Sequence, residues 1–291
     1  MSELPLFPTH QQLMTHNREK RLLVTGGAGF IGSHIVDALV DLGYRVFILD
    51  DLSSGKEENL NPKAKFYKCD LTDLKKTDRL FAKIHPYAIF HLGAQIKVGT
   101  SVQDPVADAT TNIVASVNLM RLSEKYGVEK FIFSSTSAVY GNTRIIPTPE
   151  TAATNPLSPY AISKLTVERY LKFYHDTYGL NATILRYANV YGPRQNAEGE
   201  SGVIAVFLSK MLRDETPTIN GDGEQTRDYV YVSDVVAANL MALERPKISG
   251  VFNVGTSEQT SVNEVFERLN RQFDNRFEAV QGLLEHLKPG G

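Results

Sequence analysis

The chain has 291 residues, of which 42% are apolar, enough to fill the core of one large domain or of a large domain with a smaller cap. Its 31 basic and 33 acidic residues give a formal charge of -2, so the composition does not suggest a polyanionic partner such as nucleic acid, and no metal site is predicted. Cys69 is the only cysteine, which excludes an intramolecular disulfide and fits a reducing compartment. We expect Cys69 to be a small buried side chain.

The first twenty residues contain two prolines and no apolar run of signal-peptide length. Residues 1–20 are therefore expected to form a leader arm of a cytoplasmic protein. No window of the sequence is long and apolar enough to predict a membrane span.

From Arg21 onward, short apolar runs rich in β-formers alternate with longer amphipathic stretches. The runs are residues 21–25, 44–50, 65–70, 87–93, 130–135 and 182–187. Apolar strands between helices indicate a parallel sheet that is covered on both faces. We therefore predict a doubly wound α/β fold, with a Rossmann domain over residues 21–187 and a smaller substrate-binding cap over residues 188–291. Segments of the cap are expected to return to the main sheet.

Gly26, Gly29 and Gly32 lie between the first predicted strand and the first predicted helix. Glycines there allow a tight turn and let backbone N–H groups approach a pyrophosphate, whose charge is favoured by the helix dipole. Asp50 and Asp51 end the next strand, near the spacing expected for a ribose contact. The strand, the turn, the helix and the acidic pair together predict dinucleotide binding, whereas the glycines alone would be weak evidence.

Asp50 can accept hydrogen bonds from the adenosine ribose, and its carboxylate repels a 2'-phosphate, so NAD is favoured over NADP. Ser53, Ser54 and Gly55 are expected near the same ribose. Asp70 is a candidate for contact with the adenine amino group, and an equally good alternative is that it caps the next helix.

Tyr160 and Lys164 stand four residues apart in SPYAISK, directly behind Pro159. If the stretch is helical, both side chains lie on one face about a turn apart, and Pro159 suits the first turn. A buried ammonium stabilises phenolate and lowers the pKa of a tyrosine, which makes Tyr160 a candidate general base. The alternative is a tyrosine that packs beside a solvated lysine.

Seven segments occur in order: VTGGAGFIGSH, DDLSSGKEENL, HLGAQIKVGTS, SSTSAVYG, SPYAISK, LRYANVYGPRQ and GDGEQTRDYVYVSDV. With them, the chain resembles the extended short-chain dehydrogenase/reductases over roughly Arg21 to Arg271. Among these it most resembles the UDP-glucose 4-epimerase group. The resemblance implies NAD-dependent epimerisation at C4 of a UDP-hexose through a 4-keto intermediate.

The resemblance also implies roles for individual residues. Tyr160 would take the proton of the sugar 4-hydroxyl, Lys164 would also hold the nicotinamide ribose, and Thr136 would donate or relay a hydrogen bond at the sugar O4. Asn189 and Arg227 match residues that hold the diphosphate or uridine end of the substrate. The implied cofactor contacts are Gly26, Gly29, Phe30, Ile31, Gly32, Asp50, Asp51, Ser53, Ser54, Gly55, Asp70, Leu71, Leu92, Ala94, Gln95, Asn112, Tyr160 and Lys164.

Two alternatives to an epimerase are open. Related 4,6-dehydratases and decarboxylases carry acidic residues just after the threonine, where this chain has Ser137 and Ala138, so they are disfavoured. The family usually continues with a glycine and arginine segment that closes over the nucleotide, whereas this sequence stops at HLKPGG. A catalytically weak NAD-binding protein, acting as a structural or regulatory dimer, is therefore the second hypothesis.

Two long helical patterns, Ala107 to Tyr126 and Tyr160 to Tyr178, are paired across a two-fold axis in the proteins that the chain resembles. The expected assembly is a homodimer through a four-helix bundle. Apolar residues recur at helical spacing in both patterns, namely Val114, Val117 and Met120 in the first and Leu165 and Val167 in the second. The alternative is that these residues cover the sheet.

Overall fold

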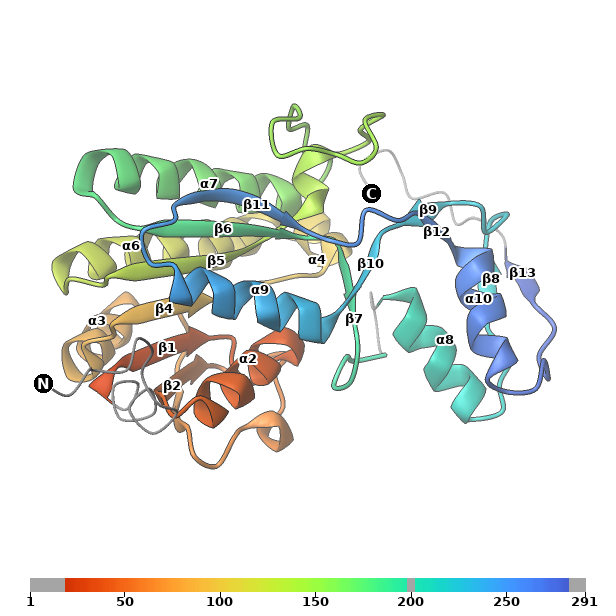
Figure 1. Ribbon diagram of the computed structural model, residues 1–291, viewed down its shortest axis with the longest axis horizontal. Coiled ribbons are helices and arrows are strands. Elements are labelled where there is room, and N and C mark those ends of the chain that lie inside the picture. Colours follow the sequence, from red (N-terminus) through yellow and green to blue (C-terminus); the bar gives the residue numbers. More distant parts are fainter. Residues whose placement is uncertain (1–18, 198–201, 283–291) are drawn as a thin grey trace, which may run out of the picture.

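A parallel sheet of seven strands forms the centre of the protein, in a computed structural model that describes residues 19–197 and 202–282 (Figure 1). The order across the sheet is β11-β6-β5-β4-β1-β2-β3, and every neighbouring pair is parallel. The strands are β1 (Arg21–Thr25), β2 (Arg45–Asp50), β3 (Lys65–Lys68), β4 (Ala88–His91), β5 (Lys130–Thr136), β6 (Ala182–Tyr187) and β11 (Gly250–Val254). This confirms the predicted doubly wound α/β fold.

Helices cover both faces of this sheet (Figure 1). On one face lie α2 (Phe30–Asp41) and α9 (Val232–Glu244), and on the other lie α3 (Leu74–Ile84), α6 (Ala115–Lys125) and α7 (Pro159–Tyr178). Residues such as Val24 and Phe90 are fully buried because both sheet faces are covered, which explains why the central strands read as continuous apolar runs.

Local sequence sets the ends of the helix that carries Tyr160. The Ser158 side chain accepts a hydrogen bond from the Ala161 N–H, Pro159 occupies the first turn, and Gly179 ends the helix with a φ of +73°. Each residue suits its place, since serine satisfies a free N–H, proline needs no N–H partner there, and glycine adopts positive φ without strain. Helix α7 therefore begins at a point that the local sequence SPYAISK determines.

The cap is a group of short elements beyond one end of the main sheet, with its own apolar core (Figure 1). It contains β7 (Asn189–Tyr191), α8 (Val203–Leu212), β8 (Thr218–Asn220), β9 (Thr226–Arg227), β10 (Tyr229–Tyr231), β12 (Thr260–Ser261), α10 (Val262–Arg271) and β13 (Val280–Gly282). A capping box between Ser261 and Glu264 starts α10. Between these cap elements the chain returns to the main domain, where α9 packs against α2 and β11 pairs with β6.

Shorter elements complete the main domain: η1 (Glu57–Asn59), α4 (Val98–Gln103), α5 (Pro105–Ala109), the π-helical turn η2 (Thr110–Val114) and η3 (Ser137–Tyr140). Residues 1–18 of the predicted leader arm and the final HLKPGG lie outside the described residues. Over the part that is described, no helix combines the length and the apolar character that crossing a membrane requires.

The apolar residues expected on the two long helices divide between two environments. Met120 and Val167 are fully buried in the core, so for them the sheet-covering alternative is correct. Val117 and Leu165 are partly buried, and Val114 is 49% exposed. Of the five apolar residues predicted on these helices, only Val114 is therefore exposed on their outward face.

Candidate active site

The predicted site residues come together at the carboxyl edge of the sheet. Gly26 follows β1, Asp50 ends β2, Asp70 follows β3, Leu92 follows β4 and Thr136 ends β5. Because the strands are parallel, these ends lie along one edge, and the order reverses between β1 and β4. Ligands of open α/β sheets bind at such a reversal point.

The glycine turn has the shape that a pyrophosphate requires. Gly26 has a φ of +70°, and a Cβ there would lie 2.7 Å from the Gly93 backbone nitrogen. A Cβ on Gly32 would lie 2.1 Å from the Gly26 carbonyl oxygen. Gly29 is the N-cap residue of α2 and has no side chain that could cap the helix. The first N–H groups of the helix therefore have no partner within it and can donate hydrogen bonds to an anion. Phe30 and Ile31 belong to this first turn.

The acidic pair divides into a buried and an exposed carboxylate. Asp50 is buried, and its two oxygens accept hydrogen bonds from the Ala28 N–H (3.0 Å) and the Leu52 N–H (2.9 Å). Burial raises the pKa of Asp50 above its ordinary value. Since each carboxylate oxygen has two lone pairs, Asp50 can brace the glycine turn and still accept from a ribose hydroxyl. Asp51 is exposed and accepts from the backbone N–H and the hydroxyl of Ser53.

Asp70 does not cap the following helix. Its carboxylate accepts from the backbone N–H (2.8 Å) and the hydroxyl (2.7 Å) of Thr72, whereas Asp73 caps α3 by accepting from the Lys76 N–H. The capping alternative for Asp70 is therefore wrong. Asp70 is exposed beside buried Leu71, and its contact with adenine stays a prediction.

Tyr160, Lys164 and Thr136 meet where α7 crosses the end of β5. The Thr136 side chain interacts with the Tyr160 hydroxyl and acts to lower its pKa. Lys164 is buried, and its Nζ lies 5.9 Å from the centroid of the Tyr160 ring. Tyr160 and Lys164 therefore lie on one face of α7, as predicted. Because Lys164 is buried, the alternative of a solvated lysine beside a packed tyrosine is wrong.

The protein alone does not lower the pKa of Tyr160, contrary to the expectation from SPYAISK. Burial raises this pKa to about 12, and the interaction with Thr136 opposes the rise. Burial lowers the pKa of Lys164 to about 8, and its Nζ donates to the Ser134 carbonyl (2.9 Å) and not to the phenol. Desolvation of the phenolate is the largest cause and the charge of Asp108 adds to the rise, so ionisation of Tyr160 requires additional positive charge.

Asn112 organises the loop that follows β4. Its Oδ1 accepts from the Gln95 N–H (2.8 Å), and its Nδ2 donates to the Gln95 carbonyl (2.9 Å). The turn that contains Asn112 is π-helical, an irregularity that often marks functional sites. Gln95, next to Ala94, is therefore held in a fixed position beside the glycine turn.

A buried histidine, which we did not single out from the sequence, links this loop to β1. The Ser116 hydroxyl donates to the Asn112 carbonyl, so it accepts from His91 Nε2 (2.8 Å), and His91 Nδ1 then accepts from the Thr25 hydroxyl (2.7 Å). Thr25 in turn accepts from the Gly93 N–H (3.1 Å). Burial lowers the pKa of His91 to about 3, so the ring is neutral. The network assigns its proton to Nε2.

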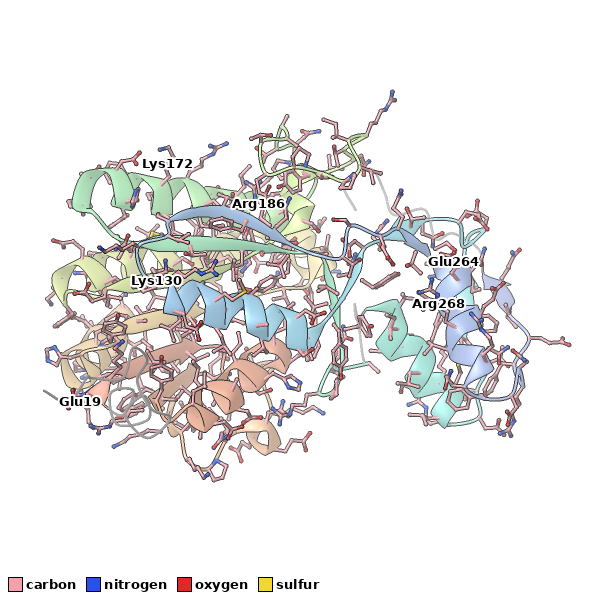
Figure 2. All side chains as sticks on the ribbon, viewed as in Figure 1. Glu19, Lys130, Lys172, Arg186, Glu264 and Arg268 are labelled. Carbon is pink, nitrogen blue, oxygen red and sulfur yellow. The ribbon has the colours of Figure 1, made fainter. Side chains whose placement is uncertain are left out.

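A buried ion pair joins α7 to β6. Arg186 lies on β6 (Figure 2). Its guanidinium is 2.6 Å from the carboxylate of Glu168, on α7. Glu168 also accepts from the Ser135 hydroxyl (2.5 Å), and Arg186 donates to the Tyr140 hydroxyl (2.8 Å). These bonds fix α7 against β5 and β6 one turn beyond Lys164. The sequence offered no signal for this pair, since its members are distant along the chain.

The two candidate substrate residues lie on different short strands of the cap: Asn189 is on β7, which pairs with β10, and Arg227 is on β9, which pairs with β12. Asn189 begins β7, two residues beyond β6, and its N–H donates to the Asp228 carbonyl (2.9 Å). Arg227 is exposed and donates to the Thr226 carbonyl (2.8 Å). The neighbouring Asp228 carboxylate accepts hydrogen bonds from the N–H groups of Thr256 and Ser257. Within residues 19–197 and 202–282, no ion pair joins Asp228 to Arg227. The guanidinium therefore keeps donors for an anionic ligand.

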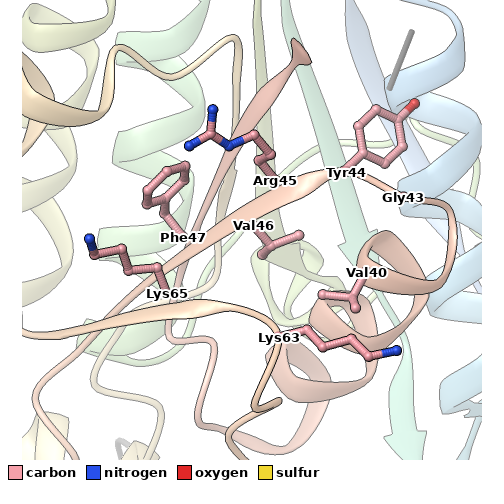
Figure 3. Close-up of a pocket in the computed structure, with 8 residues that line it drawn as sticks. All are labelled: Val40, Gly43, Tyr44, Arg45, Val46, Phe47, Lys63 and Lys65. Carbon is pink, nitrogen blue, oxygen red and sulfur yellow. The ribbon is translucent and has the colours of Figure 1, made fainter. Parts of the chain in front are cut away.

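A basic hollow of about 530 Å³ lies at the opposite edge of the sheet (Figure 3). Arg45 and Lys65 line it at the starts of β2 and β3, and Lys63 adds a third cation. Strand starts and strand ends lie at opposite edges of a parallel sheet. The hollow is therefore separate from the residues described above.

Comparison with known proteins agrees with this geometry. Residues 22–255 match the model of the NAD dependent epimerase/dehydratase family. A putative UDP-glucose 4-epimerase of Methanocaldococcus jannaschii is 46% identical over 260 residues, which cover 89% of this chain and 84% of the relative.

Two solved structures are also similar. The UDP-glucose 4-epimerase of Thermotoga maritima with UDP-glucose has a TM-score of 0.88 and 50% identity, covering 93% of this chain and 88% of that one. The UDP-glucose 4-epimerase of Thermus thermophilus in complex with NAD has a TM-score of 0.86 and 40% identity, with the same shares covered. The glycine turn and the braced Asp50 fit this cofactor. The chain belongs to the NAD-dependent epimerase/dehydratase family, and NAD is its cofactor.

Proposed function

We propose that the protein interconverts the C4 epimers of a UDP-hexose, of the UDP-glucose and UDP-galactose type, through a 4-keto sugar. The observation that carries this proposal is the pairing of Tyr160 with buried Lys164, whose Nζ lies 5.9 Å from the centroid of the Tyr160 ring, beside Thr136 at the sheet edge that holds the glycine turn. The similarity to enzymes named UDP-glucose 4-epimerase supports it.

When bound, NAD supplies a hydride acceptor for C4 and a positive charge that favours the phenolate of Tyr160. Tyr160 takes the proton of the sugar 4-hydroxyl and later returns one. Thr136 holds the same oxygen by a hydrogen bond, and Lys164 adds its charge and a donor for the nicotinamide ribose. Asn189 and Arg227 hold the nucleotide end of the substrate.

Elimination or decarboxylation would need a further acid or base beside the 4-keto sugar. The residues after Thr136 are Ser137 and Ala138, both exposed, and neither side chain can act as an acid or base. The ketone therefore has hydride return as its outlet. This favours epimerisation over the related dehydratase and decarboxylase reactions.

The direct test is to incubate the purified protein and NAD with UDP-galactose and to follow UDP-glucose by NMR. UDP-N-acetylglucosamine and UDP-glucuronate, tested in parallel, would identify the preferred hexose. We expect conversion of UDP-galactose. Absence of conversion for all three sugars, in a protein that binds NAD, would instead support the non-catalytic dimer.

We also propose that the protein is a homodimer through α7 and the segment from α5 to α6. Val106, Val114, Ile162 and Phe173 on these helices are 75%, 49%, 49% and 50% exposed, and α5 and η2 pack against α7. Light scattering at micromolar concentration should give a dimer mass, and Phe173→Glu should shift it towards the monomer. Leu212→Glu, at a 70% exposed position on α8, is the matched control and should stay dimeric. A monomeric unmodified protein would refute the proposal.

NADP should bind at least about tenfold more weakly than NAD, or about 1.4 kcal/mol, because Asp50 faces the position of the 2'-phosphate. Calorimetric titration of the protein freed of cofactor measures both affinities. Asp50→Asn should narrow the gap, and it should also weaken NAD because it removes one acceptor that braces the glycine turn. Equal affinities in the unmodified protein would contradict the role given to Asp50.

A further inference from the structure

Asp108 is a buried carboxylate with no role in the chemistry above. It lies on α5 and is 2% exposed. Its Oδ1 accepts hydrogen bonds from Gln95 Nε2 and Asn112 Nδ2, each 3.0 Å away. Both donors are neutral amides, and across the two described segments no cation forms an ion pair with this carboxylate. A buried charge held only by amides is expensive, which suggests that the charge itself is used.

The same hydrogen bonds place Asp108 against the catalytic turn of α7. Asn112 Nδ2 also donates to the Ser163 hydroxyl (3.2 Å), and Ser163 donates to the Tyr160 carbonyl (2.9 Å). Ser163 is the residue between Tyr160 and Lys164 that faces α5 and η2. The carboxylate is thus held by a fixed network beside both titrating side chains.

The other charged groups near Lys164 are already balanced or neutral. Glu168 carries a negative charge, but Arg186 neutralises it at 2.6 Å. His91 is neutral, because burial lowers its pKa to about 3. Of the two carboxylates that act on Lys164, Asp108 has the larger effect, and among the described residues it has no ion-pair partner, whereas Glu168 is paired with Arg186.

We propose that Asp108 is a positioning residue of the proposed epimerase, held by Gln95 and Asn112 so that its charge keeps buried Lys164 in the ammonium form. The inference rests on the proposed function for its catalytic meaning. Asp108 does not touch the reacting atoms and acts through Lys164. The same charge disfavours the phenolate form of Tyr160. Its effects on Lys164 and on Tyr160 can therefore be distinguished by measuring activity as a function of pH.

The sign of the expected effect follows from the charge. Asp108 raises the pKa of Lys164, against the larger lowering by burial, and it raises the pKa of Tyr160. Asp108→Asn should therefore lower both pKa values and move the whole pH profile of kcat/KM to lower pH. The ratio of variant to unmodified kcat/KM should fall as the pH rises, whereas a merely structural defect would lower it equally at every pH.

The test needs a readout that does not depend on activity. Proteins labelled at lysine Cε are titrated by NMR, and the Lys164 signal is assigned by its loss in Lys164→Ala. We expect a midpoint near 8 in the unmodified protein and a lower one in Asp108→Asn. Asp108→Ser, a second neutral variant, should shift it the same way. Asp104→Asn is the matched control, because it removes the same charge from the exposed N-cap of the same helix and should leave the midpoint in place.

A Lys164 midpoint that does not fall in folded Asp108→Asn, or that falls equally in Asp104→Asn, would overturn the inference. A kcat/KM ratio that is constant with pH would overturn it as well. Failure of the unmodified protein to epimerise any sugar would overturn the proposed function, and the Lys164 midpoint would still decide the role of Asp108.

Discussion

Tyr160→Phe should slow the epimerisation of UDP-galactose by roughly 10²- to 10⁴-fold, because it removes the proton acceptor and leaves the ring in place. The free energy of unfolding should fall by no more than about 1 kcal/mol, because the ring still packs and only one polar group is removed. Initial rates with saturating NAD, together with thermal unfolding, measure both quantities.

Lys164→Ala provides the comparison for this variant. It should also lower activity, because it removes the charge near Tyr160 and the donor for the nicotinamide ribose. The affinity for NAD should therefore fall in Lys164→Ala and remain unchanged in Tyr160→Phe. An undiminished rate in Tyr160→Phe would show that another group is the base.

Gly26→Ala should destabilise the protein by about 2–5 kcal/mol and weaken NAD binding by more than about tenfold. Two effects add: alanine is strained at a φ of +70°, and its Cβ would lie 2.7 Å from the Gly93 nitrogen and 2.9 Å from the Leu92 carbonyl carbon. The end of β1 and the loop after β4 would have to separate, and both are parts of the proposed cofactor site. Denaturant unfolding and calorimetric titration measure the two losses.

Gly127→Ala is the matched control for the close approach. Gly127 has nearly the same φ, +66°, but no atom lies within 4 Å of a Cβ built there. Its cost should be the backbone strain alone, about 1–2 kcal/mol, with NAD binding unchanged. Equal losses of stability and of NAD affinity in the two variants would contradict this explanation. They would show that the close approach of Gly93 is not the reason why position 26 requires glycine.

The sequence predicted those features that depend on neighbouring residues. The strands over residues 21–25 and 182–187 have the predicted bounds, because continuous apolar runs between helices occur where a sheet is covered on both faces. SPYAISK predicted the start of α7 because Pro159 suits the first turn, and the structure adds Ser158 as the cap. The glycine turn and Asp50 were likewise predictable from their order along the chain.

Features that depend on three-dimensional packing were not predictable in this way. The short spacing of Tyr160 and Lys164 indicated a charge effect but not its size relative to burial, so the direction of the Tyr160 pKa was wrong. Asp70 and Asp73 are both acidic residues before α3, and only backbone geometry shows which one caps it. Asp108 meets Gln95 only after the chain has passed through α4, a contact for which the sequence contains no motif.

The central claim, reversible oxidation at C4, is tested most directly with UDP-galactose that carries deuterium at C4. The purified protein and NAD are incubated with this sugar in ordinary water, and the UDP-glucose formed is analysed by NMR and mass spectrometry. The account predicts that the deuterium stays on C4 of the epimerised product, because the hydrogen moves as hydride and does not exchange with water. Replacement of the deuterium by solvent hydrogen, or the absence of UDP-glucose, would contradict it.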